Sequence, residues 1–373
     1  MEKEILCVVG ARPNFMKIAP IMRAIEAHPA LKATLVHTGQ HYDAAMKHAF
    51  FEQLGIPEPD VDLEVGSGSH AVQTAQIMLR FEPVLDRVEP DLVLVVGDVN
   101  STIACALVAI KKGVPVVHVE AGLRSRDRAM PEEINRILTD QLSELLFTTE
   151  REARANLEAE GIAGDKIHFV GNVMIDTLHH NLPRAVPAAQ TLGEMANAPF
   201  GLLTLHRPSN VDDPVVLRRL LTTLVEISDE LPLVFPQHPR TRQRIADLGL
   251  EPLLEQGRIH CLPPLGYLEM LGLMREARLV LTDSGGIQEE TTALGVPCLT
   301  LRENTERPIT VTEGTNRIVG TDPQRIRSAF DEVMSEEVSG RIPEYWDGRA
   351  AERIVEVLAQ WLEDEAPRQA GIA

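Results

Sequence analysis

The segment Thr282 to Glu290, TDSGGIQEE, combines a turn of small residues with two carboxylates. Because Gly285 and Gly286 carry no side chains, the backbone N–H groups of an opening helix turn can approach an anion there, and the helix dipole adds attraction. Glu289 and Glu290 follow one turn later, where carboxylates can accept hydrogen bonds from sugar hydroxyl groups. The segment therefore indicates a nucleotide site, although a tight turn before a solvated acidic helix face explains SGG alone equally well.

A second group of carboxylates directly follows apolar runs in the first half of the chain. Asp98 follows LVLVVG, where an Asp serves as a general base, as a hydroxyl acceptor or as the cap of the next helix. Glu120 follows VVHV, and a charge beside an apolar strand is costly unless it is paired or used. Glu132 and Glu133 follow Pro131, where they would also favour the positive end of a helix. The position of Glu120 favours a functional role, and the roles of the others stay open.

Basic side chains also follow apolar runs. Arg12 and Lys17 come after the first run in GARPNFMK, and His238 and Arg307 come after two later runs. An anionic ligand needs a local basic pocket in a chain of formal net charge −19, and these four side chains are the candidates for it. His206, in LHRP, has a similar position, although a single histidine there is usually only hydrogen-bonded in the core. The first run is not followed by GxGxxG, which disfavours dinucleotide binding.

The composition argues against several classes of protein. The 55 acidic and 36 basic residues oppose nonspecific association with nucleic acid or anionic lipid. The start MEKEILCVVG reads as a strand rather than a signal peptide, and apolar runs stay shorter than the roughly 18 residues that span a bilayer. We therefore expect a cytoplasmic protein with no nucleic-acid or membrane partner.

The cysteines and histidines show no metal-ligand spacing. The four cysteines, Cys7, Cys105, Cys261 and Cys298, lie far apart among apolar neighbours. We expect all of them to be small core residues rather than a disulfide or zinc framework, and we expect no metal site.

Short apolar runs alternate with stretches of helical periodicity in both halves, which predicts an α/β protein with doubly wound parallel sheets. The strands predicted in the first half are Ile5 to Gly10, Ala33 to Thr38, Leu92 to Gly97, Val114 to Val119 and Ile167 to Gly171. Those predicted in the second half are Gly201 to Leu205, Leu231 to Pro236, Arg258 to Leu262, Arg278 to Thr282 and Pro297 to Leu301. Predicted helices are Ala19 to Ala27, Ala71 to Val88, Thr102 to Lys112, Pro131 to Leu145 and Pro214 to Ser228.

The pattern of strands and helices dissolves between Asn181 and Pro199. We therefore predict a first Rossmann-like domain over residues 1–180, a linker over 181–199 and a second Rossmann-like domain over 200–349, followed by an amphipathic last helix near 350–366. Open α/β sheets bind ligands beyond the carboxyl ends of their strands. Since the polar clusters above all follow predicted strands, we expect the active site in the cleft between the two domains.

In these motifs the chain closely resembles the non-hydrolysing UDP-N-acetylglucosamine 2-epimerases. The match runs in family order through GARPNFMKIAP, TGQHYD, VVGDVNST, HVEAGLR, MPEEINR, VGNVMIDTL, TLHRPSN, TDSGGIQEE, TERP and EGTNRIVGTD. The resemblance implies a GT-B fold, a homodimer, a last helix that crosses back to the first domain, and no metal or redox cofactor. It also implies interconversion of UDP-N-acetylglucosamine and UDP-N-acetylmannosamine through elimination of UDP to 2-acetamidoglucal and its re-addition.

The resemblance assigns roles to individual residues of this chain. The residues that it makes catalytic are Asp98, Glu120, Glu132 and His206, with His206 close to the leaving phosphate. The residues that it places on UDP are Arg12, Lys17, His238, Leu265, Met270, Ser284, Gly285, Gly286, Glu290 and Arg307. Leu265 and Met270 lie in the segment that meets the uracil, and the sequence does not decide which carboxylate handles which proton.

Gln40, His41 and Gln73 resemble parts of a second site that binds an activating substrate molecule in some relatives. Those relatives carry a longer loop with a Tyr-Ser-Pro element before PEE. Here RSRDRAM stands between Leu123 and Pro131, which argues against allosteric activation.

Three alternatives share parts of this pattern. A hydrolysing epimerase has the same fold and elimination step, but the combination of PEE, LHRP and TERP favours the non-hydrolysing branch. A GT-B glycosyltransferase would use SGG and the glutamates but leaves the carboxylates around Glu120 unexplained. A sugar-nucleotide sensor would need the pocket without Asp98, Glu120 or Glu132. A modified substrate, such as a uronate, is also compatible with the sequence.

Overall fold

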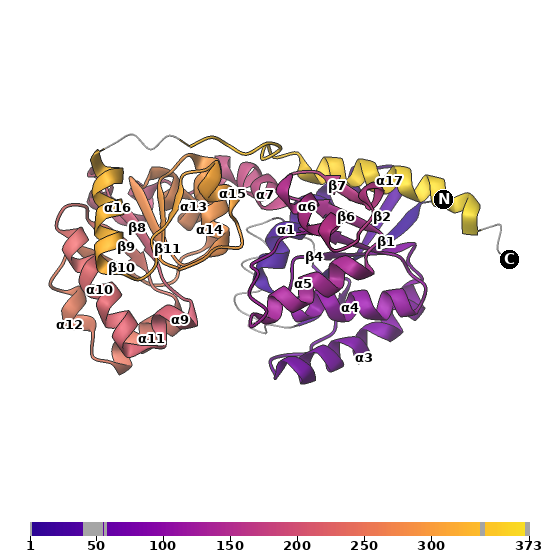
Figure 1. The fold of residues 1–373 in the computed structure, drawn as a ribbon, viewed down its shortest axis with the longest axis horizontal. Helices are drawn as coiled ribbons and strands as arrows, with labels where there is room; N and C mark the ends of the chain where they lie inside the picture. Colours follow the sequence, from indigo (N-terminus) through magenta and orange to yellow (C-terminus); the bar gives the residue numbers. More distant parts are fainter. Residues whose placement is uncertain (1, 40–54, 56–57, 336–339, 370–373) are drawn as a thin grey trace. The chain divides into compact units, whose positions relative to one another are not determined.

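The computed structural model describes residues 2–39, 55, 58–335 and 340–369, with the side chains of residues 12 and 365–369 outside the description. The chain divides into two compact units. Unit 1 consists of Met1–His180 and Glu344–Ala373, and unit 2 consists of Asn181–Pro343. Each unit is a parallel sheet with helices (Figure 1), which confirms the predicted doubly wound α/β fold.

The sheet of unit 1 has seven strands in the order β3-β2-β1-β4-β5-β6-β7. The strands are β1 (Lys3–Val9), β2 (Leu31–His37), β3 (Val61–Asp62), β4 (Leu92–Val96), β5 (Val116–Val119), β6 (Leu145–Thr148) and β7 (Ile167–Phe169). All neighbouring strands pair in parallel. Strands β4, β5 and β6 are buried along their whole length, as their apolar sequences require for a sheet covered on both faces.

The helices of unit 1 connect these strands. They are α1 (Arg12–Glu26), α3 (His70–Val88), α4 (Asn100–Lys111), α5 (Pro131–Leu142), α6 (Glu152–Ala159), α7 (Val173–Asn181) and α17 (Ala350–Gln369), with the 3-10 turn η1 (Gly164–Lys166). The Ser69 side chain caps α3 by accepting the N–H of Val72. Pro131 begins α5, where its fixed φ suits a first helical position.

Helix α17 returns the chain to unit 1 and packs against α1. Its buried stripe includes Ile354, Leu358 and Leu362, as the predicted amphipathic pattern requires. The Asp176 carboxylate accepts the N–H groups of Ala350, at 3.1 Å, and of Ala351, at 2.7 Å. A carboxylate in this position compensates the positive end of the helix.

The sheet of unit 2 has six parallel strands in the order β10-β9-β8-β11-β12-β13. The strands are β8 (Gly201–Thr204), β9 (Leu233–Pro236), β10 (Ile259–Leu262), β11 (Leu279–Thr282), β12 (Cys298–Thr300) and β13 (Asn316–Ile318). The helices are α8 (Ala188–Leu192), α9 (Pro208–Val211), α10 (Pro214–Ser228), α11 (Pro239–Asp247), α12 (Glu251–Leu254), α13 (Tyr267–Glu276), α14 (Gly285–Leu294), α15 (Ile309–Thr312) and α16 (Pro323–Ser335). Leucines of α10 and of the central strands dominate one core of this unit.

The residues predicted as a linker form short helices in unit 2. They are η2 (Leu182–Arg184), α8 and η3 (Gly193–Asn197). Val186 donates its N–H to the carbonyl of Leu268 in α13, at 3.0 Å. This segment is therefore built into unit 2 although its composition lacks clear periodicity.

Two expectations from the sequence are wrong. The predicted helix Pro131 to Leu145 ends at Leu142, and β6 begins at Leu145, because Ser143 takes an extended conformation that stops the helix. Cys7, Cys105 and Cys298 are buried, but Cys261 is exposed. Its strand, β10, lies at the edge of the sheet of unit 2, where the apolar pattern of a strand does not guarantee burial.

Candidate active site

Several of the predicted site residues lie where the strand order of each sheet reverses. In unit 1, β1 and β4 are neighbours although they are not consecutive, and in unit 2 the same holds for β8 and β11. The carboxyl ends of such strand pairs form the crevices in which α/β sheets bind ligands. Arg12 and Asp98 follow β1 and β4, while His206 and Ser284 follow β8 and β11.

The turn after β1 is fixed by Gly10 and Asn14. The Asn14 Oδ1 accepts the N–H groups of Gly10 at 3.2 Å and Ala11 at 3.0 Å, while its Nδ2 donates to the carbonyl of Val96. A Cβ at residue 10 would collide with the side chain of Ser101 in α4. The glycine therefore lets the β1 turn lie directly against the start of α4.

Glu120 is a buried carboxylate in a strained backbone conformation. Its φ of 73° lies in the left-handed region, which is rare for residues other than glycine. Its side chain forms an ion pair with Lys17 of α1, and both side chains are buried. The N–H groups of Glu120 and Ala121 both donate to the carbonyl of Phe147, at 3.1 and 3.0 Å. Strain held by surrounding contacts is typical of functional positions.

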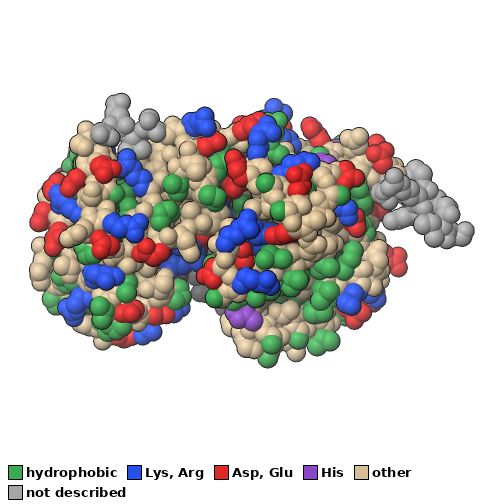
Figure 2. Space-filling view, viewed as in Figure 1, with side chains coloured by type: hydrophobic (Ala, Val, Ile, Leu, Met, Phe, Trp, Pro, Cys, Tyr) green, Lys and Arg blue, Asp and Glu red, His purple; other side chains and the backbone are tan. Residues whose placement is uncertain are grey.

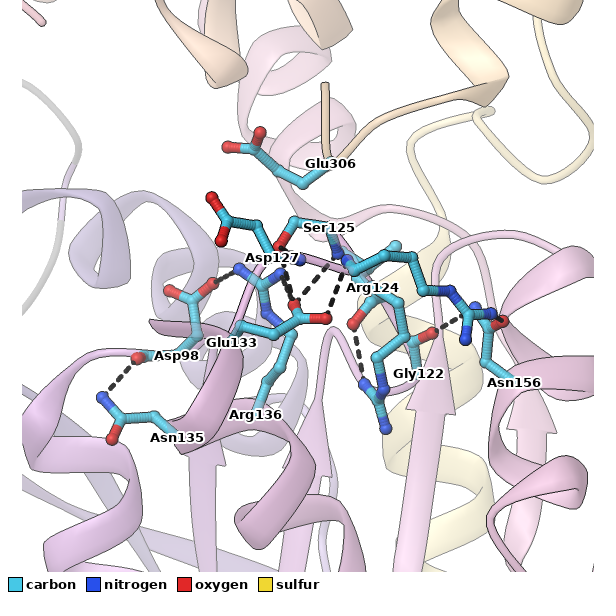
Figure 3. A network of polar contacts seen from close by, with 12 residues as sticks. Asp98, Gly122, Arg124, Ser125, Asp127, Glu133, Asn135, Arg136, Asn156 and Glu306 are labelled. Carbon is cyan, nitrogen blue, oxygen red and sulfur yellow. Dashed lines mark hydrogen bonds and ion pairs between the residues drawn. The ribbon is translucent and has the colours of Figure 1, made fainter. Parts of the chain in front are cut away.

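Asp98 is connected to Glu133 through Arg136 (Figure 3). Arg136 donates from Nη2 to Asp98 Oδ2 and from Nη1 to Glu133 Oε2, each at 2.6 Å. Glu133 also accepts the backbone N–H groups of Ser125 at 3.0 Å and Arg126 at 2.9 Å. Burial opposes ionisation of Glu133, but these donors outweigh it and lower the pKa of its carboxyl. Glu133 therefore holds the loop after β5 in place.

Glu132 has a different environment from its neighbour Glu133. It is half-buried on the first turn of α5, and within the described residues it forms no hydrogen bond or ion pair. Consecutive residues of a helix face different sides, which explains how the two glutamates of PEE have such different surroundings.

Gln73 belongs to a polar cluster beside Asp98. Its Nε2 donates to the carbonyl of Gly66 at 2.9 Å, and its Oε1 accepts from Asn100 Nδ2 at 2.8 Å. Asn135 donates to the carbonyl of Asp98 at 2.9 Å (Figure 3). The other residues predicted for a second substrate site, Gln40 and His41, lie outside the described residues.

The first turn of α14 in unit 2 offers the predicted anion cradle. Ser284 is its N-cap but makes no capping hydrogen bond with its side chain, and Gly285 and Gly286 follow. A Cβ at residue 285 would lie 3.2 Å from Glu306 Oε1. The Ser284 side chain therefore does not cap the N–H groups of this turn, and the helix dipole favours a negative charge beside them.

His206 is held by the buried carboxylate of Asp283. The His206 Nδ1 lies 2.8 Å from Asp283 Oδ1, and the same carboxylate accepts the N–H groups of His206 and Arg207 and the Nδ2 of Asn210. Burial opposes ionisation, but His206 and these donors outweigh it and lower the pKa of Asp283. An ionised Asp283 requires the proton on Nδ1, so Nε2 remains for a ligand.

His238 lies beside His206, with ring centroids 5.8 Å apart. It is the N-cap of α11, and its Nδ1 accepts the N–H of Arg240 at 3.2 Å. In a neutral His238 the proton therefore lies on Nε2.

The two glutamates of α14 are both buried but have different partners. Glu289 lies 2.7 Å from Nε of Arg307. Glu290 accepts a hydrogen bond from the Tyr267 hydroxyl at 2.9 Å. Burial raises the pKa of Glu290 to about 7, although the Tyr267 hydrogen bond acts in the opposite direction. Leu265 and Met270, on either side of Tyr267, are half-buried.

Arg12 and Lys17 belong to unit 1, whereas His238 and Arg307 belong to unit 2. Arg12 is the first residue of α1, and its side chain lies outside the description. The common basic pocket of these four residues stays a prediction.

The structure also adds partners to which the sequence interpretation assigned no role. Arg136, Asp283 and Tyr267 each bind one of the predicted residues. The sequence could have indicated Asp283, because this residue follows an apolar strand directly, as Glu120 does. The sequence could not have indicated Tyr267, because its hydroxyl contacts Glu290 from a different helix.

Lys and Arg side chains are interspersed with Asp and Glu on the face of the described residues shown in Figure 2. In the described part of the chain, His, Cys, Asp and Glu side chains form no group of three or more that would hold a metal ion. None of the described helices is both long and apolar enough to cross a membrane.

Comparison with known proteins identifies the family of this chain. The family model described as UDP-N-acetylglucosamine 2-epimerase matches residues 23–359. The chain belongs to this family. It is 42% identical to the UDP-N-acetylglucosamine 2-epimerase of Methanococcus maripaludis, over 94% of this chain and 97% of that protein. It is 44% identical to the UDP-2,3-diacetamido-2,3-dideoxy-D-glucuronate 2-epimerase of Pseudomonas aeruginosa, over 96% of this chain and 99% of that protein.

The solved structures of this epimerase family have the same fold. The crystal structure of the Methanocaldococcus jannaschii UDP-GlcNAc 2-epimerase in complex with UDP-GlcNAc and UDP matches with a TM-score of 0.86 and 40% identity, covering 96% of this chain and 99% of that one. The fold class is therefore the predicted one, GT-B with two Rossmann-like units.

Proposed function

We propose that this epimerase-family protein interconverts UDP-N-acetylglucosamine and UDP-N-acetylmannosamine by inverting carbon 2. The observation that carries the proposal is the carboxylate cluster of unit 1, in which a strained, buried Glu120 and an Arg136-bound Asp98 follow neighbouring strands. A protein that only binds a sugar nucleotide has no need for such costly carboxylates.

The reaction requires elimination rather than simple deprotonation. The proton on carbon 2 is not adjacent to a carbonyl, so its removal alone would leave an unstabilised carbanion. We propose that a carboxylate takes this proton while the bond from carbon 1 to the diphosphate oxygen breaks and its electron pair leaves with UDP. The products of this step are 2-acetamidoglucal and UDP. The diphosphate oxygen then adds back to carbon 1 as a proton reaches carbon 2 from the opposite face.

The residues divide between holding UDP and moving protons. Asp98, Glu120 and Glu132 carry the proton transfers on the two faces of the sugar. The N–H groups at the start of α14, together with His206, bind the diphosphate, and Glu290 accepts the ribose hydroxyls. Tight retention of UDP keeps both halves of the intermediate in place until they recombine.

A second substrate is supported by a specific similarity. The relative from Pseudomonas aeruginosa, named for UDP-2,3-diacetamido-2,3-dideoxy-D-glucuronate, is 44% identical to this chain, which is close to the 42% identity of the Methanococcus maripaludis protein. Epimerisation at carbon 2 is common to both names. The diacetamido uronate is therefore the alternative substrate for the same mechanism.

Proton NMR in deuterated water tests the function. With UDP-N-acetylglucosamine we expect both epimers, deuterium at carbon 2 and UDP still attached, and the same assay with the diacetamido uronate identifies the preferred substrate. Release of free N-acetylmannosamine would support a hydrolysing enzyme. Absence of exchange with either substrate would contradict the proposal and favour a glycosyltransferase or a sensor.

We also propose that the protein acts as a cytoplasmic homodimer. Large apolar side chains are exposed on two helices of unit 1: Val72 and Leu79 of α3 at 59% and 66%, and Ile134 and Leu138 of α5 at 43% and 48%. Exposed apolar side chains gathered in this way mark association surfaces. Light scattering should give twice the mass of the chain for the native protein and a smaller mass for Leu79→Glu.

A further inference from the structure

A completely buried histidine–aspartate pair lies beneath the carboxylates of unit 1. The His118 Nδ1 lies 2.7 Å from Asp140 Oδ1, and neither side chain is exposed to solvent. His118 belongs to β5 and Asp140 to α5. Neither residue reaches the surface at which a substrate would bind, so any effect on the reaction must pass through other residues.

The histidine holds the turn that carries Asp98. His118 Nε2 lies 2.7 Å from the carbonyl oxygen of Gly97, which only accepts hydrogen bonds, so Nε2 donates. The N–H of Gly97 donates to the carbonyl of Val119 at 3.1 Å. Gly97 has a φ of 68°, and both its polar backbone groups are fixed to the neighbouring strand. Gly97 immediately precedes Asp98, so these hydrogen bonds also fix the position of the Asp98 backbone.

The aspartate holds the turn that carries Glu120. Asp140 Oδ2 accepts the N–H of Gly122 at 3.2 Å and the Nη2 of Arg124 at 2.7 Å. Glu120 has a strained φ of 73°, and such a conformation persists only when nearby contacts determine it. The hydrogen bond at Gly122, two residues later, is one of these contacts.

We propose that His118 and Asp140 form a positioning pair that fixes the distance and orientation between Asp98 and Glu120. The pair is the shared link in a chain of contacts that runs from the carbonyl of Gly97 through His118 and Asp140 to the N–H of Gly122. This inference rests on the proposed epimerase function, in which both carboxylates act on one sugar. Two proton transfers on opposite faces tolerate little change in that spacing.

Asp140→Ala breaks this chain of contacts between its two ends. An alanine offers no acceptor to the His118 Nδ1–H or to the N–H of Gly122, so neither turn is held through residue 140. We expect kcat to fall about 30-fold to 100-fold, as a small displacement of reacting groups does. The Kd for UDP should change much less than kcat, because most of the proposed UDP ligands lie in unit 2. Free UDP and 2-acetamidoglucal should escape more often for each turnover.

A conservative variant tests the hydrogen-bond pattern itself. In Asp140→Asn, the asparagine NH2 can donate to Nδ1 of a neutral His118, whose Nε2–H still donates to Gly97, and the asparagine oxygen can accept from Gly122. This arrangement keeps a complementary donor and acceptor at each link. We expect kcat of Asp140→Asn to exceed that of Asp140→Ala by about tenfold, which loss of the carboxylate charge alone does not produce.

Asp176→Ala is the matched control, because Asp176 is also a buried carboxylate of unit 1 that accepts backbone N–H groups. It should lower the melting temperature with kcat within about twofold of the wild type. An Asp140→Ala protein with wild-type kcat, a loss confined to UDP affinity, or an Asp140→Asn protein no better than Asp140→Ala would each overturn the proposal. If these variants fail to fold, amide hydrogen exchange of the wild-type segment 118–123 decides. Amide exchange as fast as in an exposed loop would contradict the pair's role.

Absence of deuterium exchange at carbon 2 of the substrate with the wild-type protein would instead reject the epimerase function.

Discussion

Asp283 holds His206 at two points, since it accepts both the backbone N–H of the histidine and its ring Nδ1. The carboxylate is fully buried, whereas the histidine is partly exposed. This relationship fixes the ring in one orientation with one nitrogen turned away from the protein core.

We expect Asp283→Asn to lower kcat about 100-fold, because an asparagine can face the ring with its NH2 group and favour the wrong tautomer. UDP binding measured by calorimetry should weaken by less than about tenfold. Asp212→Asn is the matched control, since Asp212 is a more exposed carboxylate of unit 2 bound by Arg240 and Arg244. A wild-type rate for Asp283→Asn would mean that His206 needs no orientation.

Asp98→Asn and Glu120→Gln should each abolish deuterium exchange at carbon 2. Each substitution keeps the size of the side chain but removes its basicity. UDP affinity should remain within about tenfold, equivalent to about 1.4 kcal/mol. Loss of UDP binding in either variant would mean that the carboxylate is structural rather than catalytic.

The two glutamates of PEE form a matched pair for separating catalysis from stability. Glu132→Gln should lower kcat without changing the melting temperature, because Glu132 has no partner among the described residues. Glu133→Gln should cost about 3 kcal/mol of unfolding free energy, since it leaves the buried Arg136 with one charged partner fewer. Urea unfolding measures the stability of both variants, and the deuterium-exchange assay measures their rates. A loss of stability in Glu132→Gln together with a stable but slower Glu133→Gln would refute the prediction.

Glu306 should make stability depend on acid pH. Burial opposes its ionisation, but the guanidinium groups of Arg307, Arg302 and Arg207 lower the pKa of its carboxyl from the usual 4.5 to about 2. A depressed carboxyl pKa stabilises the fold above the unfolded value, and the stabilisation of about 3 kcal/mol disappears as pH falls from 4.5 toward 2. Glu306→Gln should therefore flatten the stability curve in that window. The more exposed Glu303→Gln is its control, and equal curves for the two variants would contradict the assignment.

Glu290 should make substrate affinity depend on neutral pH. Its carboxyl has a pKa of about 7 because it is buried, so raising the pH from 6 to 8 ionises it. An ionised carboxylate accepts ribose hydroxyls more strongly, and affinity for UDP-N-acetylglucosamine should rise several-fold. Tyr267→Phe removes a hydrogen bond that favours the ionised form and should move the midpoint to higher pH. Calorimetry across this range should show no such rise for Glu290→Gln.

Much of the sheet could be predicted because parallel strands buried on both faces must be apolar throughout. Strand β6 was not predicted, because its sequence LLFT begins only two residues after the end of α5. Its first residue, Leu145, therefore continues the helical periodicity of α5. Strands β3 and β13 have two and three residues, too few to show a period. Residues 181–199 lack periodicity because their helices are short.

The site was predictable where a charge follows an apolar strand, as at Asp98 and Glu120. Its partners were not, because contacts such as Arg136 with Asp98 span 38 positions and depend on how helices pack. The strained backbone of Glu120 could not be predicted either, because the left-handed region is usually occupied by glycine and a glutamate does not indicate it.

The return of α17 to α1 has a consequence for biosynthesis. Unit 2 is a continuous segment, whereas unit 1 needs residues from both ends of the chain. During translation, unit 2 can complete its core while α1 still exposes the apolar surface that α17 will cover. The half with the proposed acid–base carboxylates is therefore finished only after α17 has been synthesised, and a chain terminated before α17 would present a folded unit 2 beside an unfinished unit 1.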